Sequence, residues 1–178
     1  MIVFVGGIHG VGKTYLGAPA AQQLGVRHAT ASQLIREERG LQTWGSDKRV
    51  AGIDENQAAL VSATTRLRAE GQRLLLDGHF VLRDTNGCLT EVDVQVFRDL
   101  QIGAVLHLAT ELDVVQGRLR DRGDHSWSKS ELRMLADHEE AHAHRVSTEL
   151  CVPLRKLFSP TSENFVTALR DVLALRSP

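Results

Sequence analysis

Hydrophobic residues along this chain gather in short uninterrupted runs, which alternate with longer stretches where apolar positions recur every three or four residues. The short runs predict buried β-strands and the longer periodic stretches predict amphipathic helices. The predicted strands span residues 2–5, 26–29, 73–77, 104–108 and 152–158. The predicted helices span residues 13–24, 31–38, 54–70, 93–100, 111–121, 129–150 and 163–175. Alternating strands and helices favour an α/β fold in which helices cover both faces of a parallel sheet.

Capping side chains mark three of the helix starts. Thr110 with Asp113, Ser128 with Glu131, and Ser162 stand where a side-chain oxygen can accept a hydrogen bond from the first turn. These residues predict where the last three helices begin.

Two polar, glycine-containing stretches interrupt the alternation. They span residues 40–53, which include Trp44, Gly45 and Gly52, and residues 123–130. In an enzyme that transfers phosphate, such excursions from the sheet are natural lids.

Composition excludes several classes of protein. The net charge of -1 argues against a general binder of nucleic acid or of membrane surfaces, so we expect neither DNA nor a membrane as a partner. The first apolar run is short and lacks a preceding basic region, which predicts neither a signal peptide nor a membrane span. Cys88 and Cys151 lie far apart without metal-ligand spacing and are interpreted as free thiols of a cytoplasmic protein.

The first predicted strand runs directly into a phosphate-binding sequence. Residues 7–14 read Gly-Ile-His-Gly-Val-Gly-Lys-Thr and fill every fixed position of G-x-x-x-x-G-K-[ST], between a strand and a helix. Lys13 is expected to reach the β- and γ-phosphates of ATP, and the Thr14 hydroxyl to bind Mg²⁺. The residues expected at the nucleotide are Gly7, His9, Gly10, Val11, Gly12, Lys13, Thr14 and Tyr15.

An acidic residue ends the strand at 73–77. Asp77 follows Leu74-Leu75-Leu76, where a carboxylate beside the phosphate loop can bind Mg²⁺ or its water. The alternative is an aspartate that starts a turn with Gly78. His79 could approach the transferred phosphoryl group, or it could be a structural histidine.

Arginines supply the positive charge that phosphoryl transfer requires. Arg118 and Arg122 lie four residues apart, on the same face of a helix that enters the second excursion. Arg36 follows the second predicted strand and is expected at the acceptor. Asn56 or Gln57 could bind the edge of a base, although an ordinary polar first turn is the favoured interpretation.

The long helix at 129–150 contains two further features. Residues 138–142 fit H-E-x-x-H, but no third ligand is evident, so we interpret them as a solvated helix flank rather than a zinc site. Glu139 falls within the apolar stripe of the same helix and would need a partner there. We hypothesise that it pairs with Arg118 or Arg122 and orients the lid; a rotated helix with Glu139 in solvent is the alternative.

Over nearly its whole length the chain resembles the adenylate-kinase-like branch of P-loop nucleotide kinases. The resemblance rests on the phosphate loop, on residues 30–36, on Leu75-Leu76-Asp77-Gly78 and on the pair Arg118 and Arg122. It implies that Arg36 binds an acceptor monophosphate, that Arg118 packs on the adenine, and that both lid arginines reach the donor phosphates. Pro160 corresponds to the loop that touches the adenine edge.

The chain departs from that family at the acceptor side. Asp77-Gly78-His79-Phe80-Val81 lacks the arginine of the family's Asp-Gly-Phe-Pro-Arg, for which Arg83 could substitute, and Gln33 replaces an aspartate. The short lid is more similar to compact archaeal-type adenylate kinases and their relatives, some of which are also ATPases.

Together these features predict one three-layer α/β/α P-loop kinase domain over residues 1–178, with a five-stranded parallel sheet in the order 2-3-1-4-5. The acceptor-binding excursion is expected at about 30–70 and the lid at about 118–130. The expected activity is Mg²⁺-ATP-dependent phosphoryl transfer to a small acceptor, most simply a nucleoside monophosphate held by Arg36, His79 and Gln57. Two alternatives stay open: a kinase of a nucleoside or sugar acid, and an ATPase switch that acts with a protein or RNA partner.

Overall fold

A computed structural model of the chain describes residues 1–40, 53–84 and 87–175. The excursion predicted at 40–53 therefore lies outside the described residues, except at its two ends. None of the described helices is long and apolar enough to cross a membrane.

Five parallel strands form the central sheet. They are β1 (Ile2–Gly6), β2 (Arg27–Thr30), β3 (Leu74–Asp77), β6 (Ile102–Ala109) and β7 (Leu154–Phe158), hydrogen-bonded in the order β2-β3-β1-β6-β7. Counted among themselves in chain order, these strands have the predicted order 2-3-1-4-5. The central β1 and its neighbour β3 are buried on both faces, which explains why their sequences are apolar without alternation.

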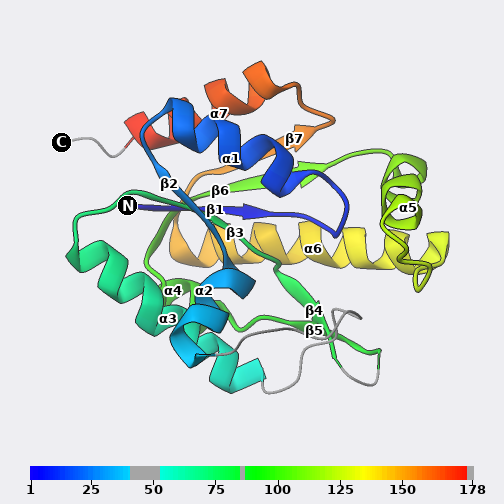
Figure 1. Cartoon of the computed structure of the whole chain (residues 1–178), viewed down its shortest axis with the longest axis horizontal. Coiled ribbons are helices and arrows are strands. Elements are labelled where there is room, and N and C mark those ends of the chain that lie inside the picture. The colour runs from blue at the N-terminus through cyan, green and yellow to red at the C-terminus, as the bar shows by residue number, and fades with distance from the viewer. Residues whose placement is uncertain (41–52, 85–86, 176–178) are drawn as a thin grey trace.

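Seven helices of the described residues surround the sheet. They are α1 (Lys13–Gln23), α2 (Ala31–Arg39), α3 (Ile53–Ala69), α4 (Val94–Asp99), α5 (Leu112–Asp121), α6 (Lys129–Leu150) and α7 (Ser162–Ala174). Figure 1 shows α1 and α7 on one face of the sheet and α6 with α4 on the other, while α5 lies at the end to which β1 and β6 point. The three-layer α/β/α fold is confirmed, and α2 and α3 pack against each other at one side.

Local sequence signals set the helix ends, with two corrections. Ser128 and Glu131 form the predicted capping box, and α6 ends at Cys151, which adopts a left-handed conformation. The cap predicted at Thr110 is wrong, because Glu111 is the N-cap and no side chain caps α5. The cap predicted at Ser162 is wrong by one residue, because the Thr161 hydroxyl accepts the N–H of Asn164.

A short antiparallel hairpin lies between β3 and α4 and was not predicted. Its strands are β4 (Val81–Arg83) and β5 (Leu89–Glu91). The side chains of α6 hold it in place: His142 Nε2 lies 2.6 Å from the carbonyl oxygen of Val92, and Arg145 donates to Glu91 at 2.5 Å. The hairpin therefore packs against α6 and lies beside the carboxyl end of β3 (Figure 1).

Three phenylalanines form the centre of the core under this hairpin. The rings of Phe4, Phe80 and Phe97 lie within 5.2 Å of one another, centroid to centroid, and all three are buried. Gly78 and Gly6 make room for them: a Cβ on Gly78 would lie 2.7 Å from the Phe4 ring, and one on Gly6 would lie 2.3 Å from the Phe80 ring. The backbone of the site thus packs directly on aromatic rings.

A buried histidine makes the stability of the fold depend on pH. His107 on β6 is 4% exposed, and its Nε2 has no hydrogen-bond partner among the described residues. Burial lowers the pKa of His107 to about 4, partly offset by Glu140, with Lys156, Lys13 and His144 lowering it further. The unfolded chain takes up this proton near pH 6.5, and the folded chain takes it up only near pH 4. His107 therefore does not reduce the free energy of unfolding above pH 6.5, and reduces it progressively as the pH falls from 6.5 to 4.

We therefore expect His107 to reduce the free energy of unfolding by about 3 kcal/mol as the pH falls from 6.5 to 4. Urea unfolding at several pH values, on the native chain and on His107→Gln, measures this. The difference in stability between the two proteins should shift in favour of the variant across that interval. A difference that stays constant with pH would contradict the prediction.

Candidate functional site

The loop between β1 and α1 has the geometry of a phosphate cradle. Gly7, Gly10 and Gly12 adopt positive φ angles of 134°, 78° and 109°, which side chains other than glycine rarely permit. The Lys13 side chain is 7% exposed and folds back over the loop, where its Nζ donates to the carbonyl oxygens of Gly7 at 2.6 Å and Ile8 at 3.2 Å. A phosphate in the loop could accept hydrogen bonds from Lys13 Nζ in place of these carbonyl oxygens.

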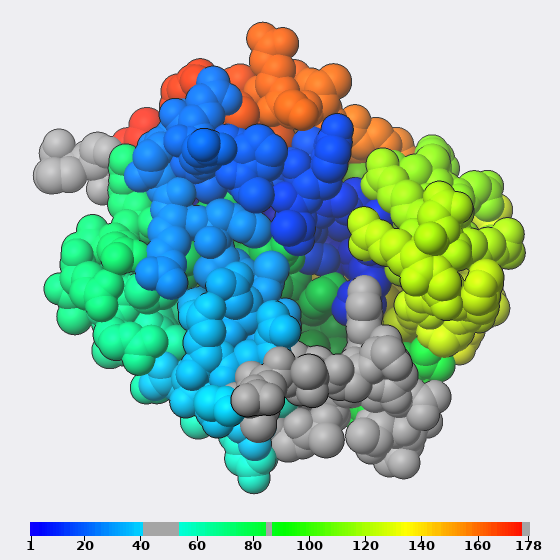
Figure 2. Space-filling view, viewed as in Figure 1, coloured from blue at the N-terminus to red at the C-terminus, as the bar shows by residue number. Residues whose placement is uncertain are grey.

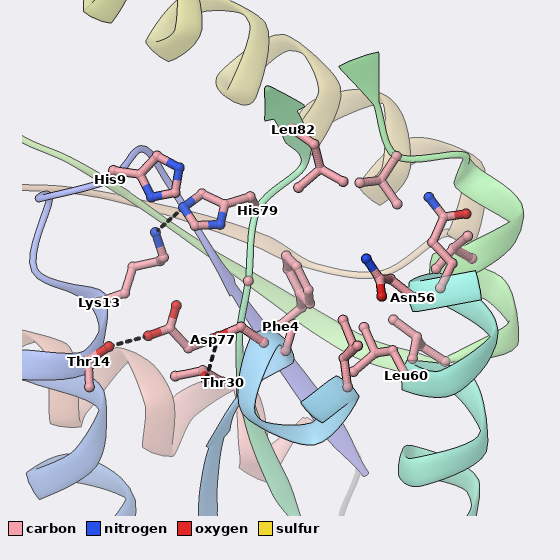
Figure 3. Close-up of a pocket in the computed structure, with 18 of the residues that line it drawn as sticks. Phe4, His9, Lys13, Thr14, Thr30, Asn56, Leu60, Asp77, His79 and Leu82 are labelled. Carbon is pink, nitrogen blue, oxygen red and sulfur yellow. Dashed lines mark hydrogen bonds between the residues drawn. The ribbon is translucent and has the colours of Figure 1, made fainter. Parts of the chain in front are cut away.

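Asp77 and Thr14 meet beside this lysine. The Thr14 hydroxyl donates to Asp77 Oδ2 at 2.6 Å, because β3 pairs with β1 and ends where α1 begins (Figure 3). The two oxygens fit Mg²⁺, which takes few protein ligands and completes its shell with water and substrate phosphates. The described residues contain no cluster of three or more metal-binding side chains, so they offer no all-protein metal cage.

A cavity of about 490 Å³ opens from the loop toward α2, α3 and the hairpin. Figure 2 shows the recess between the N-terminal loop, α2 and the segment around α5. One end is polar and holds Lys13, Thr14, Asp77 and His79 (Figure 3). The other end is mainly apolar, and its lining includes Phe4, Ile35, Leu60, Leu82, Val92, Val96, Phe97 and Leu100.

His79 and His9 lie at the polar end. His79 Nε2 is 3.1 Å from Lys13 Nζ, and the two imidazole rings lie 4.1 Å apart, centroid to centroid. The His9 ring also lies 6.1 Å from the Trp127 ring, which the Arg83 guanidinium covers at 4.5 Å. These side chains connect the phosphate loop with the lid segment at 123–130 and with β4.

The two predicted lid arginines have different surroundings. Arg118 donates to the carbonyl oxygens of Gly10 at 3.1 Å and Val11 at 3.0 Å, outside the cavity lining. Arg122 is exposed and lines the cavity. Arg118 is thus held against the backbone of the phosphate loop, whereas Arg122 forms part of the cavity wall.

Arg36, predicted to bind the acceptor, lines the cavity from α2. Its Nε is buried and has no hydrogen-bond partner among the described residues. Gln57 also lines the cavity, whereas the Asn56 amide oxygen already accepts from Arg39 at 2.5 Å. The guanidinium of Arg36 is therefore available to an anion in the cavity.

The remaining predicted residues lie at the rim. Tyr15 is 78% exposed and lines the cavity from the first turn of α1. Pro160 lies in the connection between β7 and α7, outside the lining of the cavity. Ser159 beside it has a φ of 44° and its N–H bonds the carbonyl oxygen of Ala109, which ties that connection to the end of β6.

The hypothesis about Glu139 is half right. Its side chain is fully buried, as the apolar stripe of α6 indicates, but its partners are backbone N–H groups rather than Arg118 or Arg122. The interpretation of residues 138–142 as a solvated flank is wrong for His142, which is 2% exposed and bonded to the hairpin.

Sequence reasoning missed the residues that reach the site from the hairpin and the lid. Leu82, Val92 and Trp127 carry no motif, and each is placed by tertiary packing. Arg83 was considered only as a substitute for a missing family arginine. The sequence indicated Arg83 only through its position six residues after Asp77, in the segment that follows the strand ending there.

Three comparisons relate the chain to known proteins. A family described as "AAA domain" matches residues 6–133. No curated protein matches the chain. Among solved structures, a shikimate kinase from Acinetobacter baumannii in complex with shikimate is 16% identical, with a TM-score of 0.63, over 99% of this chain and 95% of that one.

Two further structures are similar to the same extent. A sugar kinase from Janibacter sp. is 18% identical, with a TM-score of 0.57, over 98% of this chain and 95% of that one. A shikimate kinase from Bacteroides thetaiotaomicron is 17% identical, with a TM-score of 0.59, over 98% of both chains. At these identities the similarity shows a shared fold, in which kinases of different small molecules occur.

Proposed function

The chain belongs to the AAA domain family and has the fold of P-loop kinases, and on that premise we propose that it is a Mg²⁺-ATP-dependent phosphotransferase for a small acceptor. The Thr14–Asp77 hydrogen bond beside Lys13 carries this proposal, because it joins a phosphate-loop hydroxyl to a strand-end carboxylate inside a cavity. The cavity continues past these groups to Arg36, so it has room for a second reactant.

Each residue at the donor end has a chemical task in this proposal. The loop amides and Lys13 bind the donor phosphates, and Thr14 and Asp77 hold Mg²⁺, which would neutralise charge on the β- and γ-phosphate oxygens. Arg122 lines the cavity and can add positive charge to the group in transit. Arg118 braces the loop through its two carbonyl contacts and, with Tyr15 and Pro160, is assigned to the nucleotide.

A nucleoside monophosphate is the acceptor that we propose first. The Arg36 guanidinium, whose Nε has no hydrogen-bond partner among the described residues, suits a phosphate, and the apolar lining with Phe4, Leu60 and Phe97 suits the faces of a base. Gln57 can bind the edge of that base from the same cavity. A monophosphate also needs no strong general base, because its oxygens are already ionised.

A small molecule with both hydroxyl and carboxylate groups, such as a sugar acid, is the second candidate acceptor. His79 lies at the polar end, and Thr30 at the end of β2 and Ser32 at the start of α2 also line the cavity, so hydroxyl groups would find several partners. The shikimate and sugar kinases that share the fold show that it accommodates such acceptors.

One assay distinguishes these possibilities. ADP formation from Mg²⁺-ATP is measured alone and with each of five nucleoside monophosphates, shikimate and several sugar acids. We expect one monophosphate to stimulate ADP formation strongly and to appear as its diphosphate. Stimulation by an alcohol alone would replace the first acceptor by the second, and steady hydrolysis indifferent to all of them would favour an ATPase switch with a macromolecular partner.

Arg36 provides a separate test of the acceptor end. Replacing Arg36 by methionine should raise the KM for the acceptor about tenfold to a hundredfold, because a charge-assisted contact to the anion is lost. Arg27→Met is the control, since Arg27 is exposed on β2 and bonds only Gln72 among the described residues. A rise in the KM for ATP with no change for the acceptor would assign Arg36 to the donor.

A further inference from the structure

A carboxylate lies in the core directly beneath the candidate site, and the proposed reaction does not use it. Glu139 on α6 is 0% exposed. Its two oxygens accept the N–H of Phe80 at 3.0 and 3.1 Å, and one of them also accepts the N–H of Val81 at 3.3 Å. These contacts cross from one helix to the start of the hairpin, so they are tertiary contacts rather than part of either element.

The charge of this carboxylate is balanced by the phosphate loop. Burial raises the pKa of Glu139 to about 7, while the Lys13 ammonium and the backbone N–H groups of Phe80, Val81 and Gly7 lower it again. A buried ionised group needs such compensation, because its loss of hydration is otherwise uncompensated. The Lys13 ammonium of the phosphate loop therefore acts electrostatically on the buried Glu139 carboxyl.

The partners of Glu139 belong to both ends of the cavity. Gly7 and Lys13 belong to the phosphate loop, whereas Phe80 precedes β4 and Val81 begins it. Leu82 and Arg83 of the same strand line the cavity. In the sequence these groups are more than sixty residues apart. The Glu139 carboxylate on α6 accepts hydrogen bonds from Phe80 and Val81 and interacts electrostatically with Lys13.

We propose that Glu139 is a positioning residue that couples the phosphate loop to the acceptor-side hairpin. It fixes the position of Lys13 relative to the segment from His79 to Arg83. The coupling is a property of the chain itself, and its effect on turnover rests on the proposed function. An apolar residue would pack as well against the three phenylalanines, but it would leave the N–H groups of Phe80 and Val81 buried without acceptors.

Backbone amide exchange tests the coupling without any assay of activity. In Lys13→Met the carboxylate loses its cation, and we expect the N–H groups of Phe80 and Val81 to exchange about tenfold faster or more, measured by NMR. Lys156→Met is the matched control, because it removes the same charge from Glu140, the next residue of α6, at 2.5 Å. Unchanged exchange at Phe80 and Val81 in Lys13→Met, or equal acceleration in both variants, would overturn the coupling.

Kinetics test its consequence for turnover. Glu139→Gln keeps the shape but removes the charge and turns an N–H toward backbone donors, so we expect kcat to fall about tenfold or more while both KM values stay within about threefold. Glu140→Gln makes the same chemical change one residue along and should behave like the native chain.

The outcomes of the two experiments can be separated. Equal kcat values for Glu139→Gln and Glu140→Gln would overturn the positioning role, and so would a loss seen only in the KM values. If the native chain transfers no phosphate to any acceptor, the proposed function fails, while amide exchange still decides the coupling. Exchange also decides it if Glu139→Gln does not fold, because that experiment leaves Glu139 in place.

Discussion

Replacing Lys13 by methionine should reduce phosphoryl transfer about a thousandfold or more and leave the fold intact. The ammonium already lies over the loop, within 2.6 Å of the Gly7 carbonyl oxygen, and no other lysine lines the cavity among the described residues. Methionine has similar length and flexibility but carries no charge. The loss therefore reports the removal of the Lys13 charge rather than a change in the size of the side chain.

Single-turnover and steady-state assays measure this loss, with thermal unfolding as a check of the fold. Lys156→Met is again the control, because Lys156 is about half exposed and pairs with Glu140 far from the cavity. Turnover within tenfold of the native chain would remove the assignment of the loop as the donor site. Stimulation by the acceptor should disappear in Lys13→Met together with basal hydrolysis, since both reactions use the same donor.

The second large effect is expected at Asp77. Asp77→Asn keeps an oxygen for the Thr14 hydroxyl but removes the negative charge, so turnover at ordinary Mg²⁺ concentrations should fall about a hundredfold. The half-saturating concentration of Mg²⁺ should rise at the same time, because the cation loses an anionic partner. Titration of the rate with MgCl₂ at saturating ATP measures both quantities.

Asp99→Asn is the control for Asp77, since Asp99 ends α4 and bonds only the exposed Gln95 side chain among the described residues. A lower rate with an unchanged Mg²⁺ dependence would mean that Asp77 only orients Thr14 or starts the turn at Gly78. That result would leave the loop as a phosphate site but would remove Asp77 from the metal.

Local signals in the sequence were sufficient for most of the fold. The phosphate loop, the apolar β1 and β3 and the capping box of Ser128 and Glu131 each determine structure within a few neighbouring residues. Parallel strands then bring Asp77 beside Thr14 by register alone, since Val5 pairs with Asp77 and α1 follows β1. The polar end of the cavity, where Asp77 lies beside Thr14, could therefore be predicted from the sequence.

The acceptor end depends on contacts between distant residues and could not be predicted in the same way. β4 and β5 have three residues each, too few to show a period, and His142 and Arg145 of α6 hold them. Periodicity placed Glu139 in the core, but a pattern of side chains cannot reveal that its partners are backbone N–H groups.

The contacts of Gly6 and Gly78 with phenylalanine rings restrict which substitutions can occur in homologous sequences. A methyl group at residue 78 would overlap the Phe4 ring, and one at residue 6 would overlap the Phe80 ring. Each glycine is therefore expected to covary with the phenylalanine that it contacts: a larger residue replaces the glycine only where the ring has been replaced by a smaller side chain. We expect sister sequences with alanine at 78 to carry a shorter side chain at position 4, and those with alanine at 6 to carry one at position 80.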